Sequence, residues 1–545
     1  MNHHDSPTVV AQLDALLAPF DRSDAPGLVL AVAHHGKVLY RRGVGMASLE
    51  HALANTPATR MRIGSTTKHF ACFAALLLAE EGKLDVNAGI RTYVPELPLL
   101  SGDPTLVQLM THTAGYRCFL DLAMLTQGFA MVPRGGALDA QVRQRDVNFP
   151  PGERMMYSNG GYQLLSEAIE RVSGVSFESF LKHRLFDVIG MTDTDSVPDD
   201  MTVRTGMATL HLPDGKGGYR RGIFPSWEMR GEGAVVSTVD DMLCWIAHLR
   251  GPKRLGTALT WQRMLTLPRY SSGVRGSYSL GLMQTPYRGV ELLHHSGGVI
   301  GGSCQMLTVA EHALDVIILS NGAPVNPIDL SKRIVDTVLG DALSGADMSE
   351  PARSEGCAAL CGQYYSRRTH GLHEIVDQDG KLALISFNFQ PMPMPLVDID
   401  GVLQSDAGPE GAVQVLHEPL PTRGVASHIE VVHCGHAETF ARMPEIRPSP
   451  ADVARMIAGS YRSGDAAADA SIALEDGVLL MHLHGQLGAA SYRLDPLAED
   501  VFAFTPTDPL SLMCGVLTAD CTKGGVERFW IGTWRTRHLL FTRQA

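Results

Sequence analysis

The sequence contains no apolar run near the roughly 18 residues that a membrane-spanning helix requires. The longest candidate, Phe70 to Ala79, is far shorter. The first residues, Met1 to Pro7, lack a basic region followed by an apolar core, so no secretory signal is expected. Nine cysteines are scattered without the spacing of a disulfide framework, which favours reduced thiols. These absences predict a cytoplasmic protein with no membrane partner.

An excess of positive charge is also missing. Lys and Arg number 46 against 58 Asp and Glu, which gives a net charge of -12, so no nucleic-acid partner is predicted. Histidines gather in His433-Cys434-Gly-His436 and in His482-Leu-His484, but both segments are predicted strands without a convincing third ligand. We therefore expect neither a metal ion nor another cofactor.

The tetrapeptide Ser65-Thr-Thr-Lys68 combines a hydroxyl and an amine at the start of a predicted helix. It follows an extended segment, Arg60 to Gly64, and leads into residues 66–81, whose apolar side chains recur at helical spacing. Backbone N–H groups of a first helical turn stabilise negative charge, and Lys68 projects from the same side as Ser65. A buried lysine has a lowered pKa and can accept the hydroxyl proton. In the alternative, Ser65 caps the helix and Lys68 extends to solvent.

The same pattern occurs again as Ser179-Phe-Leu-Lys182. This second copy lies within Val175 to Phe186, where Phe and Leu residues recur at helical spacing. Its serine and lysine are most simply solvated positions on the polar face of that helix. A pattern this short is expected about once by chance in a chain of this length, so its context decides.

A second polar motif, Tyr157-Ser-Asn159, stands between a Pro150-Pro-Gly152 turn and a predicted helix from Tyr162 to Val172. Polar side chains on such a loop are presented rather than packed. A phenol beside a lysine can carry a proton, and the amide of Asn159 offers both a donor and an acceptor. Ordinary loop chemistry is the alternative for this tripeptide taken alone.

A third motif begins with His295, at the end of a predicted strand from Val290. It runs into Ser296-Gly297-Gly298, and glycines there let the backbone approach a ligand closely. A lone histidine on a strand is usually structural, and the neighbouring His294 is an alternative candidate.

Taken together and in this order, the three motifs resemble those of the serine β-lactamase and penicillin-binding-protein superfamily. His295 stands where the classical β-lactamases carry the lysine of Lys-Thr-Gly. Two further segments, Leu109 to Gly115 and Gly233 to Asp241, resemble the class C-like branch. The resemblance covers roughly residues 10–340 and favours His295 over His294.

This resemblance implies an α/β catalytic domain, in which an antiparallel sheet flanked by helices meets an all-helical lobe at one cleft. It makes Ser65 the nucleophile, with the backbone N–H groups of Ser65 and Gly298 as the oxyanion hole. In such sites, loss of one oxyanion donor costs about 100-fold or more in rate. Which of Lys68 and Tyr157 is the true base stays open.

The resemblance also implies roles for the other motif residues. Lys68 would be the principal proton acceptor and donor, and Tyr157 would assist the transfer. Asn159 would orient the substrate amide and Lys68. His295 would supply the electrostatic role of the missing lysine.

The second half of the chain differs from the first in its sequence pattern, with a repeated passage followed by strand-like runs. At 545 residues with 45% hydrophobic content, the chain is long enough for several globular domains. A Gly-x-Tyr-x-Ser passage occurs at Gly362 and again 97 residues later at Gly459, each time after a short helical segment and a polar linker. Strand-like runs follow at 381–385, 478–483 and 529–541. Two related antiparallel β-barrels are the economical interpretation, and one continuous β domain is the alternative.

These features predict three domains, at residues 1–345, 356–445 and 450–545. A catalytic domain of this kind followed by two β-barrels resembles the bacterial D-aminopeptidases. These dimeric enzymes release N-terminal D-residues from short peptides, amides and esters, and a loop of their last barrel narrows the cleft. By this resemblance the protein is a homodimer. The alternatives are an esterase or D-Ala-D-Ala carboxypeptidase, and a non-catalytic penicillin-binding-like sensor.

Two residues of the last predicted barrel are candidates for binding the substrate amine. Gln486 lies in the Gly485–Gly488 turn, which resembles the projecting loop. Asp508 is the only acid within Thr507 to Cys514, the segment that corresponds to the specificity region. A carboxylate is what a cation in a dry pocket requires. A solvated loop aspartate is the alternative for Asp508.

Overall fold

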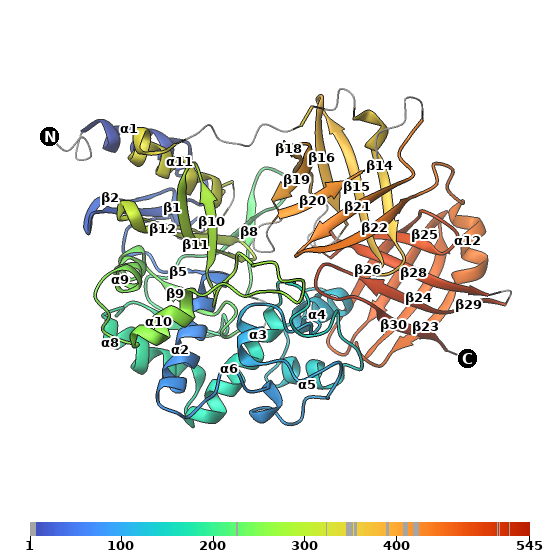
Figure 1. Ribbon diagram of the computed structural model, residues 1–545, viewed down its shortest axis with the longest axis horizontal. Coiled ribbons are helices and arrows are strands. Elements are labelled where there is room, and N and C mark those ends of the chain that lie inside the picture. Colours follow the sequence, from blue (N-terminus) through green and yellow to red (C-terminus); the bar gives the residue numbers. More distant parts are fainter. Residues whose placement is uncertain are drawn as a thin grey trace.

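The computed structural model shows an N-terminal α/β part followed by two β structures (Figure 1). It describes residues 7–224, 227–322, 324–344, 352–353, 357–387, 392–406, 412–417, 424–509, 511, 513–522 and 524–544. Most of the predicted linker at 347–355 lies outside these residues. Within them, no helix is both long and apolar enough to span a bilayer.

The α/β part is built on a six-stranded antiparallel sheet. Its strands in sheet order are β10 (Met283–Tyr287), β11 (Val290–Val299), β12 (Gly302–Val309), β13 (Leu314–Ser320), β1 (Leu28–His34) and β2 (Lys37–Val44). Helices α1 (Pro7–Leu17) and α11 (Pro327–Leu339) cover one face, where Leu28, Leu30 and Val32 point. Val29 and Ala31 point to the other face, which α9 (Val239–Arg250) and α2 (Lys68–Glu80) cover. This alternation follows from the two-residue period of a strand buried on both sides.

A helical lobe packs beside this sheet, and α10 (Ala258–Leu265) packs on α2. The lobe contains α3 (Leu106–Met110), α4 (Phe119–Gln127), α5 (Gly136–Val142), α6 (Asn159–Ser173), α7 (Phe177–Leu181), η5 (Lys182–Phe186) and α8 (Asp187–Ile189). Short strands link the lobe to the sheet, namely β3 (Met46–Ser48), β4 (Leu53–Ala54), β5 (Met61–Arg62), β6 (Asp195–Ser196), β7 (His211–Pro213), β8 (Tyr219–Arg221) and β9 (Val235–Ser237). The expected combination of a flanked antiparallel sheet and a helical lobe is confirmed.

Two helix starts differ from the sequence prediction. The helix that carries Lys68, α2 (Lys68–Glu80), is preceded by a 3₁₀ turn, η3 (Gly64–Thr67), which carries Ser65. Helix α6 begins at Asn159, three residues before the predicted start, and takes in Gly160 and Gly161. A Cβ at Gly160 would lie 2.3 Å from Gln141 Nε2, so the glycines allow the start of α6 to pack closely on its neighbours.

The first β structure after the α/β part is a nine-stranded, nearly closed antiparallel sheet, drawn in yellow to orange in Figure 1. Its strands in order are β17 (Met394–Pro395), β16 (Lys381–Ser386), β15 (Gly371–Gln378), β14 (Gly362–Ser366), β22 (His436–Arg442), β21 (His428–His433), β20 (Ala412–Leu416), β19 (Val402–Asp406) and β18 (Val397–Ile399). Its apolar interior includes Tyr364, Ile375 and Ile429.

The second β structure is a closed eight-stranded barrel at the C-terminal end. It runs through β23 (Gly459–Ser463), β24 (Ala468–Glu475), β25 (Val478–His484), β26 (Ala489–Pro496), β27 (Val501–Pro506), β28 (Gly515–Thr522), β29 (Gly525–Gly532) and β30 (Leu539–Arg543). Helix α12 (Pro450–Ile457) precedes it. The expected pair of barrel-like sheets is confirmed, and the domain boundaries given above stay a prediction.

The sequence repeat corresponds to a repeated contact. Tyr364 Oη donates to Leu360 O at 2.7 Å, and Arg442 Nη2 donates to Tyr364 Oη at 2.7 Å. In the last barrel, Tyr461 makes the equivalent bond to Ile457 O at 2.7 Å and accepts one from Arg543. Each repeat therefore fixes its short helix to its first strand through one tyrosine.

The predicted strand-like run at 529–541 is wrong in one respect. The structure divides it into β29 and β30, with Thr533–His538 forming a loop between them. This segment has no Gly or Pro to mark a turn, and His538 takes a positive φ of 53° instead. The division matters because this loop reaches the candidate active site.

Candidate active site

Lys68 lies at the centre of a buried polar cluster. Its Nζ is 2.9 Å from Ser65 Oγ, 2.8 Å from Asn159 Oδ1 and 2.9 Å from Glu232 O. Lys68 has no exposed surface, whereas Ser65, the second residue of η3, is part-exposed. The first two sequence motifs thus meet at one amine.

The three partners of Lys68 suit a neutral amine. Asn159 Oδ1 and Glu232 O can only accept, so they take the two N–H bonds of an uncharged –NH2 group. The lone pair then points to Ser65 Oγ, the one partner that can donate a proton. Burial lowers the pKa of Lys68 to about 7, and the positive charge of Arg535 also lowers it, while Glu232 opposes the shift. Lys68 can therefore act as a base near neutral pH.

Tyr157 lies against the same amine. Lys68 Nζ is 4.7 Å from the centre of the Tyr157 ring. Burial raises the pKa of Tyr157 above its ordinary value, and a hydrogen bond with Ser65 opposes this rise. The phenol is therefore protonated at neutral pH and can relay a proton to or from Ser65, whereas a phenolate base would be costly in this place.

His295 is also within this cluster, on β11. Its ring centre is 6.4 Å from that of Tyr157, and its Nε2 is 2.8 Å from Tyr278 Oη. Burial lowers the pKa of His295 well below its ordinary value, and the charge of Lys68 lowers it further. The ring is therefore neutral and supplies a hydrogen bond rather than the positive charge of a lysine. His294, on the opposite face of the strand, faces Thr285 Oγ1 at 3.0 Å.

The glycines after His295 let β11 approach the η3 turn that carries Ser65 closely. A Cβ on Gly297 would lie 1.8 Å from Ile63 O and 3.1 Å from the backbone nitrogen of Ser65. A Cβ on Gly64, where φ is +51°, would lie 2.7 Å from the nitrogen of Gly298. A Cβ on Gly298 itself would meet nothing within 4 Å. The two backbone segments predicted to form the oxyanion hole are thus adjacent, beside open space.

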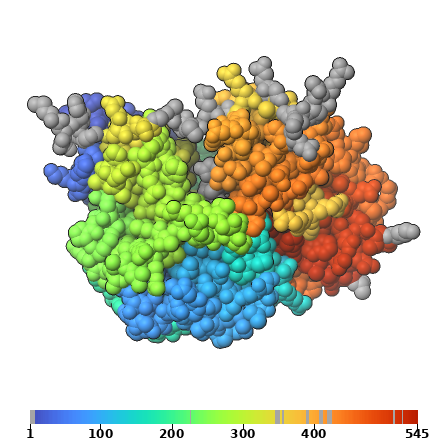
Figure 2. All heavy atoms as spheres, viewed as in Figure 1, coloured from blue at the N-terminus to red at the C-terminus, as the bar shows by residue number. Residues whose placement is uncertain are grey.

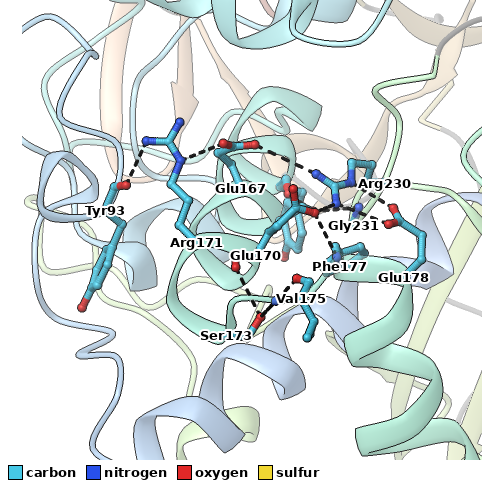
Figure 3. Close-up of polar contacts among 12 residues, drawn as sticks. Tyr93, Glu167, Glu170, Arg171, Ser173, Val175, Phe177, Glu178, Arg230 and Gly231 are labelled. Atoms are coloured by element: carbon cyan, nitrogen blue, oxygen red, sulfur yellow. Dashed lines mark hydrogen bonds and ion pairs between the residues drawn. The ribbon is translucent and has the colours of Figure 1, made fainter.

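The carbonyl that binds Lys68 belongs to a rigid turn before β9. Arg230 Nε donates to Glu178 Oε1 at 2.9 Å, and its Nη2 contacts Glu170 (Figure 3). The nitrogen of Gly231 donates to Ser166 Oγ at 2.9 Å. These contacts fix the turn to α6 and α7 and so determine where the Glu232 carbonyl points.

The Thr533–His538 loop of the last barrel is pinned to the helical lobe. Cys118 N donates to Arg535 O at 3.2 Å, and Asn148 Nδ2 donates to the same oxygen at 3.1 Å. Arg117, which is almost fully buried, donates to the carbonyls of Arg537 and His538, both at 2.9 Å. The helical lobe and the red barrel meet in Figure 2, and one apolar cluster extends from α4 into the barrel interior. This loop is therefore part of the site wall.

Two side chains of this loop face the catalytic cluster. Arg535 forms an ion pair with Asp121 of α4, with 2.6 Å between Nη2 and Oδ1, and both side chains are buried. The Arg535 charge acts on Lys68 and Tyr157. Trp534 stacks on Tyr157, with ring centres 6.4 Å apart and an interplanar angle of 10°. Sequence reasoning missed all three residues, Asp121, Trp534 and Arg535.

The two amine-binding candidates lie elsewhere on the barrel. The turn that contains Gln486 docks on the C-terminal end of α4, where Leu487 N donates to Gln127 Oε1 at 2.9 Å. Cys118, which acts electrostatically on Lys68, precedes the opposite end of that helix. Asp508 is exposed on the loop between β27 and β28. The structure therefore does not bring either residue into the buried cluster.

The remaining sequence candidates have partners outside the buried cluster around Lys68. In the second Ser-x-x-Lys copy, Lys182 pairs with Asp187 at 3.1 Å. His436 Nε2 lies 2.9 Å from Glu153 O, and His482 Nδ1 lies 2.8 Å from Ser491 Oγ. Across the residues that the structure describes, no three His, Cys, Asp or Glu side chains are grouped to hold a metal ion.

A cavity of about 390 Å³ lies where the catalytic part meets both β structures. Met155 and Met156, just before Tyr157, form one wall of it, and His373 and Phe440 of the first barrel form another. Trp534 lines this cavity and also stacks on Tyr157. Its volume falls within the range typical of ligand pockets at domain junctions.

The chain matches a known protein family and is similar to known proteins over nearly its whole length. Residues 13–339 match the family described as Beta-lactamase. The chain is similar to the D-aminopeptidase of Gluconobacter oxydans (strain 621H), with 26% identity over 98% of this chain and 99% of that protein. It is also similar to the D-aminopeptidase of Brucella anthropi, with 25% identity over 95% of each chain. Both similarities extend through the C-terminal β structures.

Solved structures show the same fold. The octameric penicillin-binding protein homologue from Pyrococcus abyssi has a TM-score of 0.56 and 21% identity, over 79% of this chain and 99% of that chain. The D-amino acid amidase from Ochrobactrum anthropi SV3, complexed with D-phenylalanine, has a TM-score of 0.53 and 21% identity, over 61% of this chain and 99% of that chain.

Proposed function

Because the chain belongs to the Beta-lactamase family, we propose that it is a serine hydrolase that works through an acyl-enzyme on Ser65. The observation that carries this proposal is the bond between Lys68 Nζ and Ser65 Oγ, in a setting that accommodates a neutral amine. A serine hydroxyl is a weak nucleophile until an adjacent base removes its proton.

Acylation follows from this geometry. Lys68 Nζ takes the Ser65 proton as Oγ attacks the substrate carbonyl carbon, and the developing oxyanion lies at the backbone nitrogens of Ser65 and Gly298. The ammonium of Lys68, assisted by Tyr157, then protonates the leaving nitrogen as the C–N bond breaks. Water attacks the ester in the second half-reaction, with the proton passing through Lys68 to Ser65 Oγ. Asn159 and His295 orient Lys68 and the substrate by hydrogen bonds.

We further propose that the substrates are short peptides, amides or esters with a free N-terminal D-residue. This is supported by similarity to D-aminopeptidases over nearly the whole chain, including the barrels. The wall formed by Trp534 and Arg535 suits a short substrate, because the loop closes the site on one side. Asp508 and Gln486 remain the proposed contacts for the substrate amine, and a homodimer remains the proposed assembly.

One set of substrates tests this function. The purified protein is incubated with D-alanine and L-alanine p-nitroanilides, a p-nitrophenyl ester and a chromogenic cephalosporin. Release from the D-anilide with little from the L-anilide is expected. Turnover of the ester alone would identify an esterase, and no turnover of any substrate would favour a non-catalytic sensor. Ser65→Ala and Ser179→Ala are matched variants of the two Ser-x-x-Lys copies, and only the first should lose activity.

A further inference from the structure

The cavity beside Trp534 lies at one end of the interior of the first β structure. Successive side chains of a strand point to opposite faces, so residues two apart share a face. On β16, Leu384 packs in the apolar interior, and Ser386 on the same face lines the cavity. On β15, Ile375 and His373 are related in the same way. The cavity is therefore the mouth of this nearly closed sheet, and the mouths of β-barrels are common ligand sites.

Two other parts of the chain cover this mouth. Met155 and Met156 come from the α/β part, and Trp534 comes from the loop of the last barrel. The turn between β21 and β22 fixes the sheet to the α/β part, since Ser272 Oγ donates to Cys434 O at 2.8 Å. The mouth is thus enclosed only when all three parts of the chain are assembled.

The lining of the mouth combines apolar side chains with paired charges. Arg154 Nη2 lies 2.7 Å from Glu153 Oε1, and Glu438 Oε2 lies 2.8 Å from Arg368 Nη2. These charges are therefore already neutralised within the protein. The apolar part of the lining includes Met155, Met156, Phe387, Val413, Phe440 and Trp534. An uncharged apolar or aromatic group is the ligand chemistry that this surface complements.

The mouth lies on the side of the site where the leaving group departs. In the mechanism above, Tyr157 assists protonation of the leaving nitrogen. Trp534 lines the mouth, and its ring centre is 6.4 Å from that of Tyr157. An extended peptide advances about 3.4 Å per residue, so the second or third residue of a substrate can reach the mouth.

We propose, resting on the acyl-enzyme function above, that the mouth of the first β structure is the subsite for the leaving part of a peptide substrate. It takes an apolar or aromatic side chain of the second or third residue, while the first residue is bound at Ser65. The substrates are then short peptides in which an apolar residue follows the N-terminal D-residue. Simple amides leave the mouth empty, because their leaving group is ammonia.

Three peptide amides test this subsite, namely D-Ala-Gly-Gly, D-Ala-Phe-Gly and D-Ala-Gly-Phe. Burial of one phenylalanine side chain corresponds to a factor of about 10 or more. At least one aromatic peptide should therefore exceed D-Ala-Gly-Gly by that factor in kcat/KM. Equal and measurable values for all three peptides overturn the proposal.

Ser386→Phe fills the mouth and should bring the ratio of these kcat/KM values close to one. Ile385→Phe is the matched control, because this neighbour on β16 points to the opposite face and does not line the mouth. Its ratio should equal that of the wild type. A preference that survives Ser386→Phe, or that is lost equally in both variants, overturns the proposal. If Ser386→Phe does not fold, Met394→Trp fills the same mouth from the edge strand β17.

Calorimetry with the Ser65→Ala variant provides a readout that needs no turnover. One of the aromatic peptides should bind about tenfold more tightly than D-Ala-Gly-Gly amide, and Ser386→Phe in the same background should cancel the difference. Equal binding of all three peptides overturns the subsite. If the wild type hydrolyses none of them while the binding difference is present, the proposed function alone is contradicted.

Discussion

Trp534 of the last barrel stacks on Tyr157 of the catalytic part, with their ring centres 6.4 Å apart. These residues are far apart in the sequence, and the contact depends on the loop that Asp121, Asn148 and Arg117 hold against the helical lobe. The last barrel is therefore a component of the candidate active site. Its apolar interior also forms one cluster with residues of α4. Removal of residues 448–545 would expose this cluster, so point substitutions in the loop are better tests than truncation.

Asp121→Ala should destabilise the folded protein strongly. The substitution leaves Arg535 buried without its carboxylate, which typically costs about 3–5 kcal/mol. Urea unfolding with a fluorescence readout measures the change. Asp469→Ala is the matched control, since it breaks the exposed Arg462–Asp469 pair, worth about 1 kcal/mol or less. Equal losses for the two variants would contradict a buried anchoring role for Asp121.

The rate of acylation should rise with pH through about 7. Lys68 must be neutral to accept the Ser65 proton, and burial lowers its pKa to about 7. Below that pH the amine is protonated, so the rate should fall about tenfold for each pH unit. A stopped-flow burst with a p-nitrophenyl ester measures acylation directly. A midpoint near the ordinary lysine pKa of 10.5 would show that Lys68 is not desolvated in solution.

Tyr157→Phe should reduce kcat by about 100-fold or more, because it removes a proton relay and leaves the ring in place. Binding of substrate should change little, since the stacking with Trp534 is retained. Tyr116→Phe is the control, as the Tyr116 hydroxyl is buried without a hydrogen-bond partner among the described residues. If both variants keep wild-type kcat, the relay role of Tyr157 is wrong.

The sequence predicted which residues gather around Lys68, because they lie in short contiguous motifs, and their catalytic roles stay a prediction. Ser65, Lys68, Tyr157, Asn159 and His295 meet in one place. Each motif could be recognised locally, the α/β part followed from the resemblance of these motifs to a known family, and the barrels followed from strand-like runs and the Gly-x-Tyr-x-Ser repeat.

The wall of the site could not be predicted in this way. From the sequence, Thr533–His538 is predicted to continue a strand. Its hydrogen-bond partners Arg117 and Asp121 lie about 400 positions earlier in the chain. Asp121 gives no sequence signal, because its burial depends on the docking of another domain.

Asp508→Asn should raise KM for substrates with a free amine, because Asp508 is a proposed contact for that amine. N-acetylated substrates should show no such change, because they carry no ammonium for the carboxylate to bind. Asp520→Asn, on a neighbouring strand of the same barrel, controls for loss of one negative charge. An unchanged KM in Asp508→Asn would remove this residue from the binding site and direct attention to the wall around Arg535.

Covalent trapping of the acyl-enzyme tests the central claim most directly. The protein is incubated with a slowly hydrolysed β-lactam, and the intact mass and the labelled peptide are read by mass spectrometry. We predict one adduct per chain, carried by Ser65, absent in Ser65→Ala and retained in Ser179→Ala. An adduct on another residue, or unchanged labelling of Ser65→Ala, would contradict Ser65 as the nucleophile.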